Sequence, residues 1–155
     1  MRSAIANPIR QRQPWLRWSW APGDDHPMIT ALAVVGVAVA MLMAVFGLPP
    51  VDVHGPLHYL GIMDPLCGGT RAARYTMLGE WRQAWRYNPL GIVAVLGSAA
   101  LVGRCLIGAI TGRWLTATIA WTPRRVRLVV VVVVVLLALL EVRQQLLVHL
   151  LTTTG

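Results

Sequence analysis

Three long apolar stretches dominate the chain, and polar segments rich in Arg, Trp, Gly and Pro separate them. The first covers residues 28–48, the second residues 89–110 and the third about residues 124–145. Each is close to the ~20 residues that a helix needs to cross the hydrocarbon of a bilayer. We therefore predict an all-α membrane protein with three transmembrane helices.

The residues that begin these stretches support the helical interpretation. Pro89 suits the first turn of a helix, where its missing N–H is not needed. Thr122 and Pro123 supply an N-cap and a first helical residue for the third stretch. The valine-rich run 128–140 would also suit a strand buried in a soluble protein. A lone strand cannot satisfy its backbone groups in lipid, so we expect a helix there as well.

The polar segment 51–88 connects the first two stretches, and we expect one further helix in it, over residues 70–88. At about 100° per residue, its apolar and indole side chains share one broad face beside a stripe of arginines. This pattern is typical of a helix lying in the membrane interface, although a helix packed on the spans with a solvated arginine face fits it too. The residues expected to contact lipid are Arg74, Trp81, Arg82, Trp85 and Arg86.

Composition agrees with a membrane location. Of 155 residues, 56% are hydrophobic and only 13% charged, about half the charged share of a soluble domain. The net charge is +8, and every basic residue is Arg. Because these arginines flank apolar stretches, we expect them to contact membrane lipids and not nucleic acid.

The distribution of arginines also predicts an orientation. The segment 1–27, which is rich in Trp and Arg, and the connector after the second stretch carry more arginines than the first loop and the tail. The positive-inside rule then places the N-terminus in the cytoplasm and the C-terminus outside. The segment 1–27 is either an interfacial anchor or a disordered tail. Residues 28–151 are expected to form a single membrane domain.

One charge lies inside an expected span. Arg104 could mark a functional intramembrane charge, or its side chain could extend to the interface. Its position towards the end of the second stretch favours the second interpretation.

A short motif precedes the helix expected in the loop. In Cys67-Gly68-Gly69-Thr70-Arg71, the glycine pair permits a tight turn and Thr70 is a candidate N-cap. The loop setting of Cys67 and the apolar setting of Cys105 do not favour a disulfide between them.

This region resembles a group of bacterial membrane proteins called domain of unknown function 2752 (DUF2752). The group's pattern is Cys-Pro-x-Cys-Gly-x-Thr-Arg-Ala, followed by a Gly, an Ala and Asn-Pro-Leu. The matching residues here are Pro65, Cys67, Gly68, Thr70, Arg71, Ala72, Gly79, Ala84, Asn88, Pro89 and Leu90. The resemblance implies a three-span protein of the bacterial cytoplasmic membrane and names no activity.

The chain departs from that pattern at positions that bear on chemistry. Asp64 replaces the first Cys, so the motif cannot form a dithiol–disulfide pair, and His54 stands where many members have another Cys. His54, His58, Asp64 and Cys67 offer the N, O and S donors that zinc accepts. A solvated loop without metal explains the same residues, so zinc is a candidate ligand only, and we expect no other cofactor.

These features give an expected function. With no catalytic set visible, we expect a non-enzymatic accessory or scaffold component of a membrane complex. A protein partner or a second copy would pack against small residues of the helices. These residues are Gly36, Ala40, Ala44, Ala99, Gly103, Gly108 and Gly112.

Two other functions stay open. One is a thiol- or metal-handling protein that uses Cys67, with its pKa lowered by Arg71 and the helix start. The other, a transporter or channel, is disfavoured because three spans are few for a pathway.

Overall fold

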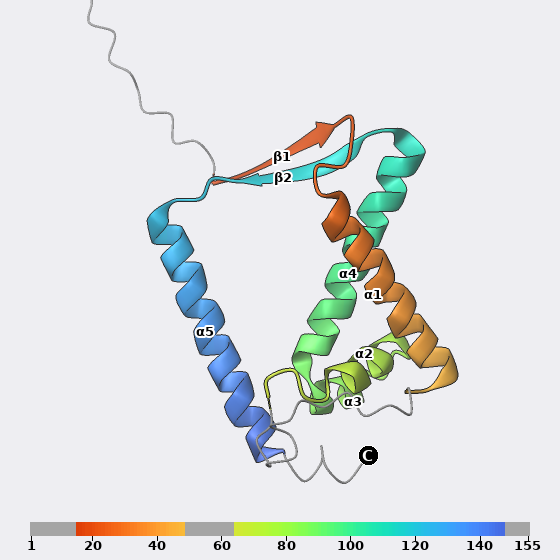
Figure 1. Ribbon diagram of the computed structural model, residues 1–155, viewed down its shortest axis with the longest axis vertical. Coiled ribbons are helices and arrows are strands. Elements are labelled where there is room, and N and C mark those ends of the chain that lie inside the picture. The colour runs from red at the N-terminus through yellow and green to blue at the C-terminus, as the bar shows by residue number, and fades with distance from the viewer. Residues whose placement is uncertain (1–14, 49–63, 148–155) are drawn as a thin grey trace, which may run out of the picture.

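The computed structural model describes residues 15–48 and 64–147, which form a mostly helical frame (Figure 1). In chain order the elements are β1 (Leu16–Ala21), α1 (Pro27–Phe46), α2 (Gly69–Met77), α3 (Trp81–Tyr87), α4 (Pro89–Thr111), β2 (Trp114–Ile119) and α5 (Pro123–Leu146). Helices therefore occupy all three of the long apolar stretches, as the sequence predicts.

Two of the helices, α1 and α4, are long and apolar enough to cross a membrane. Their 20 and 23 residues correspond to about 30 and 35 Å of helix at the standard rise, against roughly 30 Å of hydrocarbon. The helix α5 begins as its sequence indicates, with the Thr122 side chain accepting a hydrogen bond from the Arg125 N–H and Pro123 in the first turn.

The helices α1 and α4 pack side by side and run in opposite directions (Figure 1). Ala33 and Ala40 of α1 are buried. A Cβ added at Gly36 would lie 3.6 Å from Ser98 Oγ of α4. Small residues therefore allow the close backbone approach on which helix association in lipid depends. The small-residue face predicted in the first span is used within the chain itself.

A two-stranded antiparallel sheet lies at the end of the molecule where α1 begins and α4 ends (Figure 1). In its register Leu16 pairs with Ile119 and Ala21 with Trp114. The all-α prediction is wrong here, and so is the interpretation of residues 16–21 as part of a disordered tail. The interfacial anchor stays a prediction. The two strands lie far apart in the sequence and meet because α1 and α4 are antiparallel. No local sequence pattern predicts such a pairing.

Two short helices, α2 and α3, lie at the opposite end (Figure 1). The sequence predicts one helix over residues 70–88, but Gly79 interrupts it with a φ of +77°. The Gly79 N–H donates to Thr76 O at 3.1 Å and the Glu80 N–H to Tyr75 O at 2.9 Å. This pair of bonds is the Schellman motif, which ends a helix at a left-handed glycine. The single predicted helix is therefore two helices in contact with each other.

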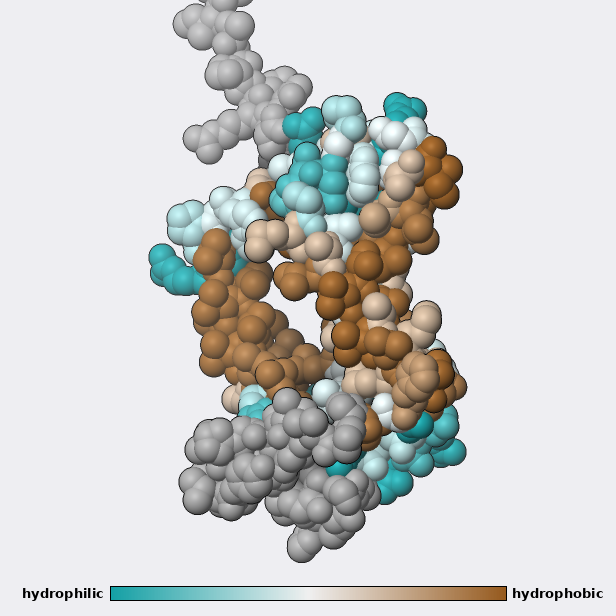
Figure 2. All heavy atoms as spheres, turned by 45° about the vertical axis from the view of Figure 1, so that its right-hand side comes forward, coloured by the Kyte–Doolittle hydropathy of each residue, from teal (hydrophilic) through white to brown (hydrophobic). Residues whose placement is uncertain are grey.

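Hydrophobic and polar residues are separated along the long axis. Figure 2 shows apolar side chains over the middle of the long helices and hydrophilic residues gathered at the two ends. The tryptophans follow the same division. Trp15, Trp18, Trp20, Trp114 and Trp121 belong to the sheet end, and Trp81 and Trp85 to α3. The helix α5 stands apart from α1 and α4 along its middle (Figure 1).

Candidate functional site

Asn88, directly before α4, organises the segment from Asp64 to Leu90, which contains the resemblance motif. Its side chain is fully buried. Its Oδ1 accepts a hydrogen bond from the Leu90 N–H at 2.9 Å and so caps α4. Its Nδ2 donates to the carbonyl oxygens of Pro65 and Cys67, each at 2.9 Å. One amide thus joins the turn before α2 to the start of α4.

The turn itself is shaped by Asp64 and Gly68. The Asp64 carboxylate accepts a hydrogen bond from the Leu66 N–H at 2.7 Å, and the Asp64 carbonyl accepts one from the Cys67 N–H at 3.0 Å. Gly68 then adopts a φ of +74° and is the N-cap of α2, a conformation that favours glycine. The prediction of Thr70 as the N-cap is therefore wrong, because α2 already begins at Gly69.

Gly91, which no sequence pattern distinguishes, brings α2 and α4 together. A Cβ at Gly91 would lie 2.6 Å from Ala72 Cβ and 2.8 Å from Gly69 O. Ala72 is fully buried at this contact. In an apolar stretch one glycine looks like any other small residue, so only the packing distinguishes Gly91.

Cys67 lies in a small buried cluster with Ala72 and Tyr87, against which Tyr75 packs. The rings of Tyr75 and Tyr87 stack with centroids 5.4 Å apart. Burial raises the pKa of the Cys67 thiol, and the nearby Asp64 carboxylate raises it further. Arg71 acts in the opposite direction but more weakly. The prediction of a lowered pKa is therefore wrong, and the thiol is protonated at neutral pH.

The proposed zinc donors are only partly described. His54 and His58 lie outside the described residues. Asp64 is engaged in the turn, and Cys67 faces the tyrosine cluster. Among the residues that the structure describes, no group of three or more His, Cys, Asp or Glu could hold a metal ion. The zinc site stays a prediction.

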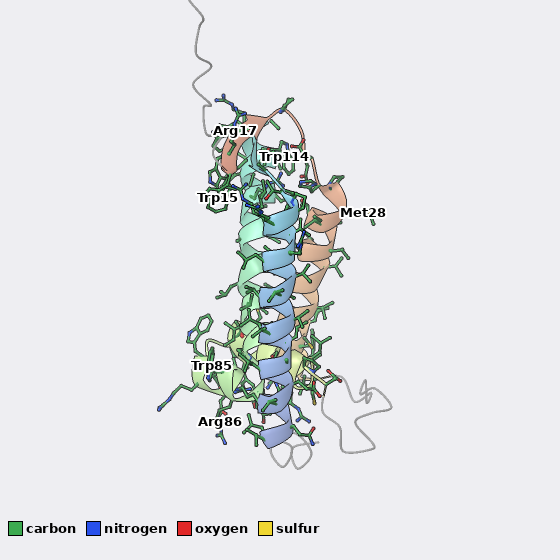
Figure 3. All side chains as sticks on the ribbon, turned by 90° about the vertical axis from the view of Figure 1, so that its left-hand side faces the viewer. Trp15, Arg17, Met28, Trp85, Arg86 and Trp114 are labelled. Carbon is green, nitrogen blue, oxygen red and sulfur yellow. The ribbon has the colours of Figure 1, made fainter. Side chains whose placement is uncertain are left out.

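The five residues predicted to contact lipid occupy different settings. Arg74 is half-buried, and its Nε donates to Met43 O near the end of α1 at 2.9 Å. Trp81, Arg82, Trp85 and Arg86 are exposed on α3. Together these four line a shallow hollow. Figure 3 shows Trp85 and Arg86 on the outer side of α3, at the opposite end of the molecule from Trp15, Arg17 and Trp114.

A second polar cluster, at the sheet end, contains the one charge predicted inside a span. Arg104 of α4 forms an ion pair with Asp24 at 2.9 Å and also donates to Leu115 O of β2. Its guanidinium lies 5.5 Å from the centre of the Trp114 ring. The side chain thus reaches from within α4 to the polar end.

Asp24 completes this cluster. Its carboxylate accepts hydrogen bonds from Thr30 Oγ1 at 2.6 Å and the His26 N–H at 3.0 Å. The Thr30 bond is the largest of the influences that lower the pKa of Asp24 to about 2, with smaller contributions from His26 and Arg104. No pattern in the sequence indicates this pair, because Asp24 and Arg104 are 80 positions apart in the chain.

Comparison with known proteins gives a match to a protein family, and it covers the region around Asn88. No curated protein and no solved structure matches the chain. Residues 56–102 match the family described as "Protein of unknown function (DUF2752)". This range contains the Asp64 turn, α2, α3, Asn88 and the first half of α4. The resemblance inferred from the sequence is confirmed over residues 56–102.

Proposed function

We propose that the chain is an integral protein of the bacterial cytoplasmic membrane and crosses it three times, through α1, α4 and α5. The exposure of α5 supports the third crossing. Every apolar side chain from Leu128 to Leu137 is exposed, with fractions of 39–63%. Water would penalise such a surface, whereas lipid solvates it on all sides.

We propose further that α3 lies in the membrane interface and that the N-terminus is cytoplasmic. The pairing of β1 with β2 supports a common side for the N-terminal segment and the connector before α5. These are the two arginine-rich parts of the chain. By the positive-inside rule that side is the cytoplasm, which leaves α2, α3 and the end of α5 on the outer side.

Within the membrane, we propose a non-enzymatic scaffold or accessory role. The observation that carries it is an open small-residue face on α4. Ala99 is exposed, and a Cβ added at Gly103 would meet nothing within 4 Å among the described residues. These residues are one helical turn apart, so a partner helix could approach the backbone closely there. The other small-residue face, around Gly36, is already covered by α4.

Purification of the tagged full chain in mild detergent tests this role. We expect a co-purifying membrane protein or a second copy of the chain, and we expect G103L to remove it. The matched control is G97L, because Gly97 is also open but lies on a different side of α4. A monomer without any partner, or equal loss in both variants, would contradict the proposal.

The thiol-handling function makes a different prediction for Cys67. A reactive thiol would be alkylated quickly at neutral pH, because the thiolate is the reacting species. Since burial and Asp64 raise the Cys67 pKa, we expect slow alkylation in a C105A background, and faster alkylation after D64N. Rapid labelling at neutral pH would favour thiol handling over the scaffold role.

A further inference from the structure

We infer that the outer face of α3 binds the phosphate headgroup of an anionic phospholipid. This face consists of Trp81, Arg82, Trp85 and Arg86, and we call it the Trp–Arg face. The inference rests on the proposed membrane location and adds a preferred lipid class to it.

The Trp–Arg face is built from two pairs of residues, each spaced by one helical turn. Trp81 and Trp85 form one pair, with exposed fractions of 51% and 60%. Arg82 and Arg86, both exposed, form the other. Residues four apart are neighbours on a helix surface, and the four side chains line a common hollow. The opposite side of α3 is fixed by buried Ala84 and Tyr87.

The two arginines of this face are available for a ligand. Within the described part of the chain, neither side chain makes a hydrogen bond or an ion pair. Arg74 and Arg104, in contrast, are engaged by protein groups. Two adjacent cations on an exposed face are complementary to a phosphate group.

The surroundings favour an anionic lipid over a zwitterionic one. Arg143 of α5 donates to Trp85 O and Arg86 O, which adds a third positive charge at the end of α3. Three cations repel the ammonium group that a zwitterionic headgroup carries beside its phosphate. The acidic residue nearest in sequence to the Trp–Arg face is Glu80, at the start of α3. Its single negative charge is outnumbered by the three arginines.

The indoles and α4 supply the apolar part of the site. Indole rings prefer the headgroup level of a bilayer, so Trp81 and Trp85 would flank the glycerol region. The helix α4 begins two residues after α3 and exposes Val93 and Leu96 in its first two turns. An acyl chain that follows the headgroup therefore has an apolar surface to contact.

Native mass spectrometry of the full-length protein, titrated with phosphatidylglycerol or phosphatidylcholine, tests the inference. We expect the wild type to retain phosphatidylglycerol preferentially. We expect R82Q/R86Q to lose affinity for it by about fivefold for each arginine removed, the effect of one basic residue near an anionic membrane. The matched control is R124Q/R127Q, which removes two exposed arginines from the other end of the molecule.

Three outcomes would overturn the inference: unchanged preference in R82Q/R86Q, equal losses in both double variants, or equal wild-type retention of the two lipids. Alkaline carbonate extraction of the same variants separates this failure from failure of the proposed membrane location. If R82Q/R86Q stays in the membrane but keeps its lipid preference, only the lipid site is wrong. If the wild type itself is extracted, the membrane location is wrong.

Discussion

Asn88 uses all of its hydrogen-bonding groups for architecture. Its carbonyl caps α4 and its amide nitrogen holds two carbonyl oxygens of the preceding turn. Because the side chain is fully buried, water has little access to replace a bond that is lost. A single side chain thereby ties the turn of residues 64–68 to the start of α4.

We predict that N88A destabilises the protein by about 3 kcal/mol. This sum combines about 1 kcal/mol for the lost cap with about 2 kcal/mol for one buried and one partly buried carbonyl left without donors. Thermal unfolding in detergent measures it. Q83A is the control, because Gln83 is exposed on α3 and its replacement should have little effect. Equal melting temperatures for N88A and the wild type would contradict the assigned role of Asn88.

Gly91 and Gly97 offer a matched pair within one helix. We predict that G91A costs about 1–3 kcal/mol, the usual range for overpacking, because its methyl group would meet Ala72 and Gly69 O of α2. G97A should be neutral or stabilise by up to about 1 kcal/mol, since its Cβ meets nothing within 4 Å among the described residues. Thermal unfolding in detergent compares the two variants. A G97A protein less stable than G91A would show that Gly91 does not pack closely against α2.

At the scale of elements, the sequence predicts what is local. Hydropathy, Pro89 at the start of α4 and the pair Thr122-Pro123 before α5 are local signals, and the ranges of the long helices follow from them. The break at Gly79 also has a local signal in the sequence, because a glycine followed by Glu80 is compatible with a helix end. The amphipathic pattern of residues 70–88 continues through the break and conceals it.

The remaining features depend on contacts between distant residues. The β1–β2 pair joins residues about 100 positions apart, and the Asp24–Arg104 pair joins residues 80 positions apart. Neither can be read from periodicity or spacing. The burial that raises the pKa of Cys67 likewise depends on Tyr87 of α3, which the motif does not include.

The Asp24–Arg104 pair makes the sheet end sensitive to acid. The pKa of the Asp24 carboxyl is about 2 in the folded protein, below the ordinary value of 3.8. A carboxyl with a lowered pKa stabilises the fold fully above its ordinary pKa, and this contribution is lost as the pH falls through the folded value. We therefore predict that the stability difference between wild type and D24N is constant above about pH 5 and shrinks between about pH 4 and pH 2.

Thermal melting of both proteins across this range measures the effect. D25N is the control, because Asp25 is exposed beside Asp24 and makes no bond to Arg104. A D24N difference that stays the same down to pH 2 would show that the carboxylate does not stabilise the fold through its ionised form.

At the scale of the whole molecule, the two polar ends differ in how they are held. The sheet end is held by β1–β2 pairing and by Arg104. At the other end, α2 and α3 pack on α4, and the Gln144 side chain of α5 donates to Tyr87 O at 3.0 Å. The helix α5 is thus attached near both ends and exposed between them (Figure 1). This arrangement is what the proposed third crossing through α5 needs.

We predict that single cysteines at the two ends react from opposite sides of the membrane. In a C67A/C105A background, S19C and T118C, on adjacent strands, should react with a membrane-impermeant maleimide only after the cells are opened. Q83C on α3 and L146C at the end of α5 should react in intact cells. Ser19, Thr118, Gln83 and Leu146 are all exposed, so a lack of labelling cannot be attributed to burial. L146C labelling that follows T118C would mean that α5 does not cross, while reversal at all four sites would invert the orientation and leave the three crossings intact.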